Sequence, residues 1–293
     1  MPGIPYEYKH ITNAKGVFTV TIQEKLKFIH ENPTISWHEH VQQAGPGGTE
    51  LNIDHADNQL AIMETLGIDR IVVSIPLPGD KHCPPEAFRI ANDVAYKATQ
   101  RYPGKVLGMA FVNPGFQKEA LDEVERCVNE YGFVGVKLYH HYFMDNPVQY
   151  PLIEKCIDLD IPVLMHCGHP MDPATRARQP RISDGVHMAN VARRYPEATF
   201  IMGHIGGGGD WQWSLKAIAD TPNVFADTGG SVMDRTQLEE AVRYLGADRL
   251  IFATDGTWDN CVAKILGSDI SVEDKKTILE GTAFLKFLGK AGK

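Results

Sequence analysis

Two histidines separated by one residue lie near the start of the chain, in the run TISWHEHV of residues 34–41. Side chains alternate between the two faces of a strand, so His38 and His40 would point to one side and Glu39 to the other. Two imidazoles on one face can bind a single metal ion. The same pattern also suits two core histidines that bond to the backbone, and the pair alone does not decide between these interpretations.

Three further polar residues end later apolar runs. His166 follows IPVLM, His204 follows TFIMG before a glycine-rich turn, and Asp255 lies in LIFATDGT. Singly, each has a structural explanation, as a core or rim histidine or, for Asp255, as a helix N-cap. Taken together with the first pair, these residues could offer three neutral imidazoles and a carboxylate to one ion. Such a set suits zinc, with manganese or iron possible, and leaves a position open for an activated water.

Eight apolar runs alternate with segments of helical periodicity from residue 34 onward. The runs cover residues 34–41, 70–77, 105–112, 133–140, 161–167, 198–204, 223–229 and 249–255. The helical segments cover residues 55–66, 84–101, 117–131, 148–159, 185–194, 211–220, 234–245, 259–267 and 271–288. This alternation predicts βαβ units and a parallel sheet, in an α/β fold. Eight units favour a (β/α)8 TIM barrel, with an open doubly wound sheet as the alternative.

The chain length allows one such barrel domain, over residues 34–293, preceded by an N-terminal extension over residues 1–33 with a short helix at 21–31. Every polar candidate then falls at the carboxyl end of a predicted strand, and Lys137 joins them at the end of the fourth. The carboxyl ends of barrel strands surround the active site. Packing alone explains such a gathering poorly, because buried polar groups cost free energy unless they are bonded.

The ordered motifs HEH, VGVKLYHHY, VLMHCG, IMGHIGGG and FATDGTW resemble the amidohydrolase superfamily, in its amidohydrolase-2 branch, which includes aminocarboxymuconate-semialdehyde decarboxylase. The resemblance covers residues 34–289. It implies a barrel that holds one divalent metal ion, commonly zinc, on His38, His40, His166 and Asp255. It also implies that His204 stands beside the metal as a catalytic group, and that the enzyme can form dimers or tetramers.

Two positions depart from the patterns of this superfamily. Other branches bridge two metals with a carboxylated lysine on the fourth strand, where this chain has Lys137. Because the amidohydrolase-2 branch generally works with one metal, Lys137 is interpreted as a substrate-contacting or structural cation, with a solvated or salt-bridged rim lysine as the alternative. The C-terminal helix often carries Gly-Asn-Ala in this branch, and here residues 281–283 read Gly-Thr-Ala.

Residues in the predicted loops could face the mouth of the barrel. Tyr139, Trp211 and Trp258 could contact flat or apolar parts of a substrate, or could pack between loop and barrel. The loop after His166 carries Arg176 and Arg178, whose guanidinium groups could pair with a carboxylate. We therefore expect a small, anionic substrate, although a solvated basic loop would give the same pattern.

Three functions are compatible with these residues. The first is a hydrolase in which metal-activated water attacks an ester, lactone or amide, with Asp255 accepting the proton of the water. The second is a non-oxidative decarboxylase of a small unsaturated or aromatic acid, in which water or His204 supplies the proton that replaces carbon dioxide. The third is a non-catalytic metal-binding barrel. The lack of large insertions over the mouth favours hydrolysis slightly.

Composition limits the partners of the protein. The net charge is −8, and without a run of Lys and Arg a nucleic-acid surface is not expected. Five cysteines without CxxC spacing predict reduced thiols in a cytoplasmic protein. No stretch approaches the roughly 20 apolar residues of a membrane span. We expect a cytoplasmic enzyme with a small-molecule substrate and no nucleic-acid or membrane partner.

Overall fold

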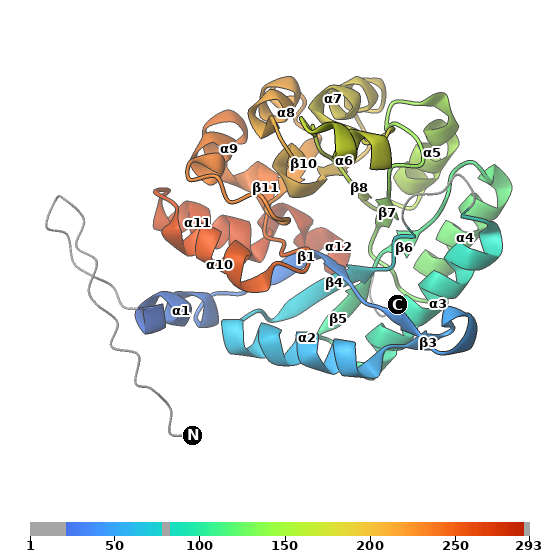
Figure 1. Cartoon of the computed structure of the whole chain (residues 1–293), viewed down its shortest axis with the longest axis horizontal. Helices are drawn as coiled ribbons and strands as arrows, with labels where there is room; N and C mark the ends of the chain where they lie inside the picture. The colour runs from blue at the N-terminus through green and yellow to red at the C-terminus, as the bar shows by residue number, and fades with distance from the viewer. Residues whose placement is uncertain (1–21, 78–82, 290–293) are drawn as a thin grey trace, which may run out of the picture.

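Short parallel strands form a ring at the centre of the molecule (Figure 1). The computed structural model describes residues 22–77 and 83–289. One sheet has the order β1 (Ile35–His40), β4 (Arg70–Ser74) and β5 (Val106–Gly108). The other has the order β6 (Ala110–Phe111), β7 (Val136–Leu138), β8 (Val163–Met165), β9 (Phe200–Met202), β10 (Val224–Asp227) and β11 (Leu250–Ile251).

Two junctions join these sheets into a barrel. β5 and β6 are consecutive parts of one barrel strand, interrupted at Met109, whose N–H donates to the Val73 carbonyl at 2.8 Å. At the other junction Trp37 N–H donates to the Phe252 carbonyl, and Asp255 N–H donates to the His38 carbonyl, both at 2.9 Å. The eight strand positions therefore close, and the predicted barrel is confirmed over the open sheet.

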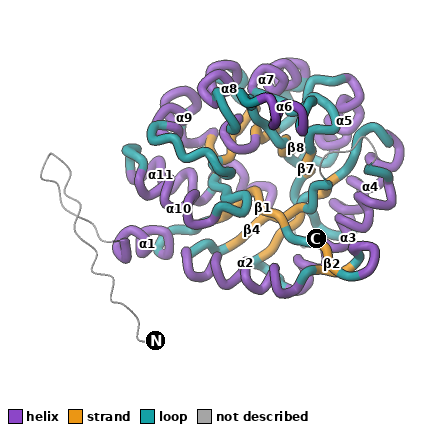
Figure 2. The backbone as a smooth tube through the Cα atoms, in the orientation of Figure 1, coloured by secondary structure: helices purple, strands orange, loops and turns teal. Residues whose placement is uncertain are grey.

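Helices surround this ring (Figure 2). They are α1 (Ile22–His30), α2 (Ile53–Leu66), α3 (Pro85–Arg101), α4 (Gln117–Asn129), α5 (Tyr150–Asp158), α6 (Pro173–Arg178), α7 (Gly185–Arg194), α8 (Trp211–Ile218), α9 (Gln237–Leu245), α10 (Trp258–Gly267), α11 (Val272–Glu280) and α12 (Leu285–Leu288). The predicted helix at 21–31 is α1, whereas residues 1–21 of the predicted extension lie outside the described residues. Among the residues described, no helix has both the length and the apolar character needed to cross a membrane.

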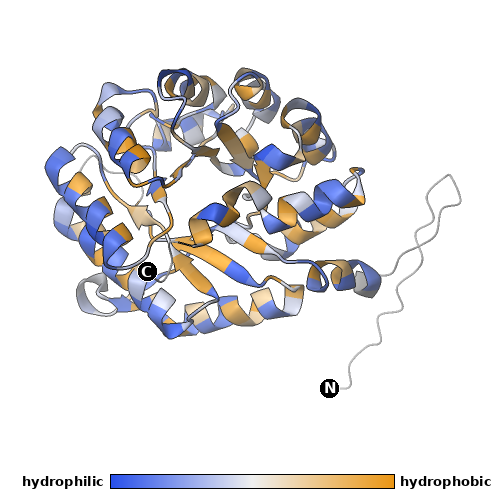
Figure 3. Ribbon diagram, turned by 180° about the vertical axis from the view of Figure 1, so that it is seen from behind, coloured by the Kyte–Doolittle hydropathy of each residue, from blue (hydrophilic) through white to orange (hydrophobic). Residues whose placement is uncertain are grey.

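The interior divides into two apolar regions. A large cluster lies between the strands and the helices, and a smaller one fills the barrel itself. Strands and the inner faces of the helices are accordingly the apolar parts of the ribbon in Figure 3. The smaller cluster takes Ile35, Val72, Met109, Val134, Leu164, Ile201 and Ile251 from the strands and their approaches, and Phe284 and Phe287 from the C-terminal segment. One end of the barrel is therefore apolar, and the polar candidate residues lie at the other end.

A register shift in β1 directs its side chains to both ends of the barrel. The pairing with β4 slips between Ser36 and Glu39. Trp37 packs into the apolar end, where its ring centroid lies 5.2 Å from that of Phe284. The next residue, His38, is buried at the polar end. Bulges of this kind re-aim side chains next to active sites. Trp37 therefore belongs to the core and does not line the mouth.

Three local features differ from the sequence-based expectations. The predicted helix over 271–288 is broken at Gly281, which caps α11 with a left-handed φ of 62°. A Cβ at this position would lie 2.6 Å from Trp37 Nε1, so a larger residue does not fit. The loop after β8 contains α6, a helix that the sequence analysis did not predict. After β1, the short strands β2 (Gln43–Ala44) and β3 (Glu50–Leu51) form a small antiparallel pair.

Candidate metal centre

Three of the predicted ligands meet at the polar end of the barrel. His38 Nε2 lies 3.6 Å and His40 Nε2 lies 3.2 Å from Asp255 Oδ1. One donor atom from each of the three lies within 4.8 Å of the others, a group that could hold a metal ion. Two of these ligands come from β1, and the third follows β11, the strand that closes the barrel against β1. Barrel closure therefore assembles the site.

The partners of the two histidines fix which ring nitrogen is available. His38 Nδ1 lies 2.9 Å from Asp227 Oδ2, and His40 Nδ1 lies 3.2 Å from the Ser74 carbonyl. Both partners are acceptors, so each Nδ1 carries the proton and donates it. The Nε2 lone pairs are left facing Asp255. This is the arrangement that metal-binding histidines show, with the second nitrogen held by a carboxylate or a carbonyl.

The charge states at this end of the barrel also suit metal binding. Burial and the nearby Lys137 ammonium lower the pKa of His38 to about 4, so its imidazole is neutral at neutral pH. Burial alone would raise the pKa of Asp255, but His38 and His204 hold it far below its usual range. Burial opposes ionisation of Asp227 as well, yet His38 lowers the pKa of that carboxyl to about 2. Neutral imidazoles beside ionised carboxylates are the forms that bind a metal.

Lys137 is completely buried on β7, so the interpretation as a solvated rim lysine is wrong. Its Nζ lies 2.5 Å from His38 Nε2 and donates to that lone pair. Burial lowers the pKa of the Lys137 ammonium to about 8, against the opposing effect of Asp255 and Asp227. The cation is thus placed among the ligands themselves, where it and a metal ion would compete for the same nitrogen.

His166 lies beside this cluster but faces another partner. Its Nε2 is 3.3 Å from Gln179 Oε1, and its ring stacks on that of Tyr139 with the centroids 4.2 Å apart. The His204 ring crosses the His166 ring at a centroid distance of 4.8 Å. Burial lowers the pKa of His166 well below its usual range, so this imidazole is also neutral. Its assignment as a fourth ligand stays a prediction.

His204 occupies a strained turn after β9. Its φ is 61° and that of Ile205 is 53°, values that side-chain-bearing residues rarely adopt. Its N–H donates to Asp227 Oδ1 at 2.9 Å, its Nδ1 donates to the Cys167 carbonyl at 3.0 Å, and its Nε2 lies 3.0 Å from Asp255 Oδ2. Burial alone would lower the pKa of His204, but Asp255 more than reverses this and raises it. His204 is therefore suited to hold a proton beside the cluster.

A cavity of about 210 Å³ opens directly above these groups. Its polar floor includes His166, His204 and Asp255. Residues from the α6 region, among them Gln179 and Ile182, and the segment of residues 230–232 form its walls. The cavity is small, and three of the predicted site residues are among those that line it.

The predicted substrate-binding residues divide into two groups. Lys137 and Tyr139 lie among the histidines, as described above. Arg176 Nε donates to the Pro170 carbonyl at 2.6 Å, and Arg178 Nη2 donates to Thr175 Oγ1 at 3.0 Å. Trp211 and Trp258 are nearly buried in the layer between barrel and helices. None of these last four is among the residues that line the cavity, and their contact with a substrate stays a prediction.

Asp227, at the end of β10, is a further candidate site residue that was not predicted from the sequence. It accepts hydrogen bonds from His38, from the N–H of His204 and from the N–H of Gly229. One carboxylate thus orients a metal ligand and also holds the turn that carries the candidate catalytic histidine. The signal was present in the run NVFADTG, in which an acidic residue ends an apolar strand as Asp255 does.

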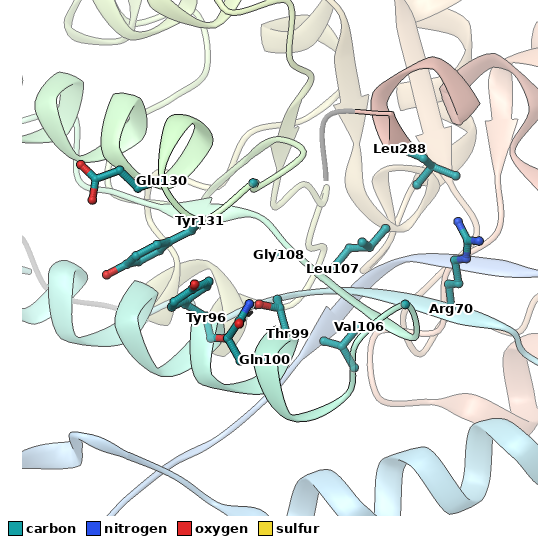
Figure 4. Close-up of a pocket in the computed structure, with 12 residues that line it drawn as sticks. Arg70, Tyr96, Thr99, Gln100, Val106, Leu107, Gly108, Glu130, Tyr131 and Leu288 are labelled. Carbon is teal, nitrogen blue, oxygen red and sulfur yellow. Dashed lines mark hydrogen bonds between the residues drawn. The ribbon is translucent and has the colours of Figure 1, made fainter. Parts of the chain in front are cut away.

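A larger cavity of about 440 Å³ lies at the opposite end of the barrel (Figure 4). Its lining includes Arg70 and Val106 at the starts of β4 and β5, together with the stacked rings of Tyr96 and Tyr131. It contains none of the candidate site residues. Catalytic residues of such barrels lie at the carboxyl ends of the strands, so the smaller cavity above His204 is the candidate active site.

The profile of the amidohydrolase family matches residues 36–283. The chain therefore belongs to the amidohydrolase family, in its amidohydrolase-2 branch, as the ordered motifs predicted.

The relatives of known name include decarboxylases and a hydratase. A gamma-resorcylate decarboxylase of Polaromonas sp. is 27% identical over 284 residues, covering 79% of this chain and 86% of that protein. A 2-keto-4-carboxy-3-hexenedioate hydratase of Sphingobium sp. is 25% identical over 271 residues, covering 76% of this chain and 80% of that protein. The structure of a dihydroxybenzoic acid decarboxylase from Polaromonas sp., with bound manganese and 2-nitroresorcinol, superposes with a TM-score of 0.68 at 22% identity. It covers 88% of this chain and 97% of that one.

Proposed function

We propose that this protein is a metal-dependent, non-oxidative decarboxylase of a small aromatic carboxylic acid. The observation that carries the proposal is the cavity whose floor joins His204 to Asp255 of the metal cluster. The names of the curated relatives favour this reaction over hydrolysis, since several are decarboxylases and one is a hydratase.

In such a reaction the bond between the ring carbon and the carboxylate breaks, and its electron pair stays on the ring carbon. A proton must then reach that carbon as carbon dioxide leaves. His204 Nε2 is the group we assign to this proton, because His204 lines the cavity and Asp255 favours its protonated form. The Cys167 carbonyl and the Asp227 carboxylate hold the ring and the backbone of His204 in this position.

We propose His38, His40 and Asp255 as ligands of one divalent ion, with His166 as the fourth. When bound, such an ion would orient the substrate oxygens and withdraw electron density from the ring. The donor set suits zinc and manganese alike, and manganese is the metal in the related decarboxylase structure. Asp227 and the Ser74 carbonyl orient the imidazoles.

The substrate is proposed to be a hydroxylated benzoate or a similar planar acid. The small size of the cavity and the apolar side chains of Ile182 and Val232 in its wall suit a single ring. We propose the metal ion as the partner of the substrate carboxylate, because Arg176 and Arg178 each donate to a protein acceptor and do not line the cavity.

The test is a panel of aromatic acids, lactones, amides and unsaturated diacids. The protein is loaded in turn with Mn²⁺ and with Zn²⁺, and carbon dioxide and all products are quantified. We expect at least one aromatic acid to lose carbon dioxide in proportion to its consumption, and the His38→Ala variant to lose both metal and activity. Turnover only of lactones or amides would support hydrolysis instead, and addition of water to a double bond would support a hydratase.

A further inference from the structure

Glu39 lies between the two ligand histidines in sequence but points away from them. Its side chain is only 1% exposed. Glu39 Oε2 accepts a hydrogen bond from the Gly256 N–H at 3.2 Å, and Ser36 Oγ donates to Oε1 at 3.4 Å. A buried carboxylate costs free energy in a layer where an apolar residue would pack, so its contact with the residue that follows Asp255 requires an explanation.

Three consecutive N–H groups after β11 are all held by β1. Thr254 N–H donates to Ser36 Oγ at 3.1 Å, and Asp255 N–H donates to the His38 carbonyl at 2.9 Å. Gly256 N–H completes the series on Glu39. The strand that supplies two metal ligands thus also fixes the backbone of the third ligand, residue by residue.

This backbone needs to be held, because its conformation is unfavourable. Asp255 has a φ of 46° and is followed by Gly256 at 75°. A residue with a side chain is strained in such a conformation, which persists only where its surroundings impose it. If the turn relaxed, the Asp255 carboxylate would turn away from His38, His40 and His204.

We propose that Glu39 is a positioning residue for the metal site, which holds the Asp255–Gly256 turn from the far side of β1 and so keeps the Asp255 carboxylate on the ligand histidines. This inference rests on the proposed metal-dependent function. Glu39 itself touches neither the metal ligands' donor atoms nor the cavity. Its effect is on the geometry of the Asp255 carboxylate and hence on metal affinity.

The test measures Mn²⁺ affinity by competition with a chelating dye, with the melting temperature recorded for every variant. Glu39→Leu removes the acceptor for Gly256 and should weaken Mn²⁺ binding about 10- to 100-fold, the range typical of residues that orient metal ligands. Glu39→Gln keeps an acceptor oxygen in the same place and should stay within about threefold of the wild type, because the inference depends on the hydrogen bond. Wild-type affinity in Glu39→Leu would overturn the inference.

A matched control separates positioning from general loss of stability. Glu123 on α4 is also completely buried and accepts from Arg126 and Asn92, far from the cluster. Glu123→Leu should lower the melting temperature and leave Mn²⁺ affinity unchanged. If affinity fell in both leucine variants in proportion to their loss of stability, Glu39 would have a structural role only.

Two further variants cover the cases in which Glu39→Leu does not fold or the proposed metal site is wrong. If Glu39→Leu does not fold, Glu39→Met removes the same acceptor with a smaller change of shape, and should likewise weaken Mn²⁺ binding about 10- to 100-fold; an unchanged affinity would refute the inference. His38→Ala tests the metal site itself. Retention of Mn²⁺ in His38→Ala would contradict the proposed function, whereas loss there combined with wild-type binding in Glu39→Leu would contradict only the role of Glu39.

Discussion

Asp227 Oδ2 lies 2.9 Å from His38 Nδ1, and both side chains are sealed from solvent. The other oxygen of the same carboxylate accepts the His204 N–H. One buried group therefore orients a candidate ligand from β1 and a candidate proton donor from the turn after β9. This link explains how the two halves of the site keep their relative positions.

Replacement of Asp227 should weaken both halves of the site. Asp227→Asn removes the charge that favours the Nδ1–H form of His38, and places an amide where three N–H groups now find acceptors. We expect Mn²⁺ affinity to fall about 10- to 100-fold, measured by equilibrium dialysis, with a further loss of kcat at saturating metal. Unchanged affinity would show that Asp227 does not orient His38.

Replacement of His204 should impair catalysis without impairing metal binding. In His204→Gln the proton carrier is lost, and kcat should fall about 100- to 10,000-fold while metal content by atomic emission stays that of the wild type. His169→Gln is the matched control and should keep most of the activity, because His169 lies on the same rim but is not among the residues that line the cavity. Loss of metal from His204→Gln would make His204 a ligand.

Arg249 should be important for stability although it is far from the site. Its guanidinium donates to the carbonyls of Ile218, Ala219, Thr221 and Val224 at 2.8–3.0 Å, tying the end of α8 to β10. Lysine keeps the charge but cannot reproduce a planar set of donors. Arg249→Lys should lower the free energy of unfolding in urea by about 2 kcal/mol.

The control for this change is the same substitution on the surface. Arg243 is exposed and pairs with Glu240 one helical turn away, so Arg243→Lys should leave the urea midpoint almost unchanged. Equal midpoints for the two variants would show that the carbonyl contacts of Arg249 add nothing to stability.

Asp184 should make a contribution to the free energy of unfolding that depends on pH. It caps α7 and contacts His187 Nδ1 at 2.7 Å and His169 Nδ1 at 3.0 Å. Burial alone would raise the pKa of Asp184, but the hydrogen bonds from His187 and His169 lower it to about 2. Burial alone would lower the pKa of His187, but Asp184 raises it. A carboxyl pKa lowered this far corresponds to about 2 kcal/mol of stabilisation.

The sign of the effect follows from these directions. The contribution of Asp184 is present above its unfolded pKa of 3.8 and is lost as the pH falls towards about 2. The contribution of protonated His187 is present below 6.5 and is lost as the pH rises through its raised pKa. The difference in unfolding free energy between wild type and Asp184→Asn should therefore be largest near pH 5 and smaller at pH 3 and pH 8. A difference that does not vary with pH would contradict this.

The strand positions, and the place of the candidate ligands on one rim, were predictable because apolar runs alternate regularly with helical segments along the chain. Apolar runs fixed the eight strand positions, and the location of His38, His204 and Asp255 at run ends placed them on one rim. The gathering of His38, His40 and Asp255 follows from barrel closure, which brings β1 beside the segment after β11.

Other features depend on contacts between distant segments. At Gly281, where α11 ends, a Cβ would lie 2.6 Å from Trp37 Nε1, and Trp37 is more than 200 residues away along the chain. α6 could have been read from its Asp172 N-cap and Pro173, but it is only 6 residues long and lacks an apolar period. The choice between hydrolysis and decarboxylation is not encoded in the ligands, because both reactions use the same donor set.

The proposed decarboxylation is tested most directly by following the carboxyl carbon and the incoming proton in the same experiment. The Mn²⁺-loaded protein is given 2,6-dihydroxybenzoate labelled with ¹³C at the carboxylate, in D2O, and both products are analysed by mass spectrometry. If the protein is a decarboxylase, we expect one labelled carbon dioxide for each acid consumed, and one deuterium on the ring carbon that carried the carboxylate. We also expect His204→Gln to slow both together. Consumption of substrate without labelled carbon dioxide, or turnover across the panel of lactones and amides alone, would contradict the proposed decarboxylation.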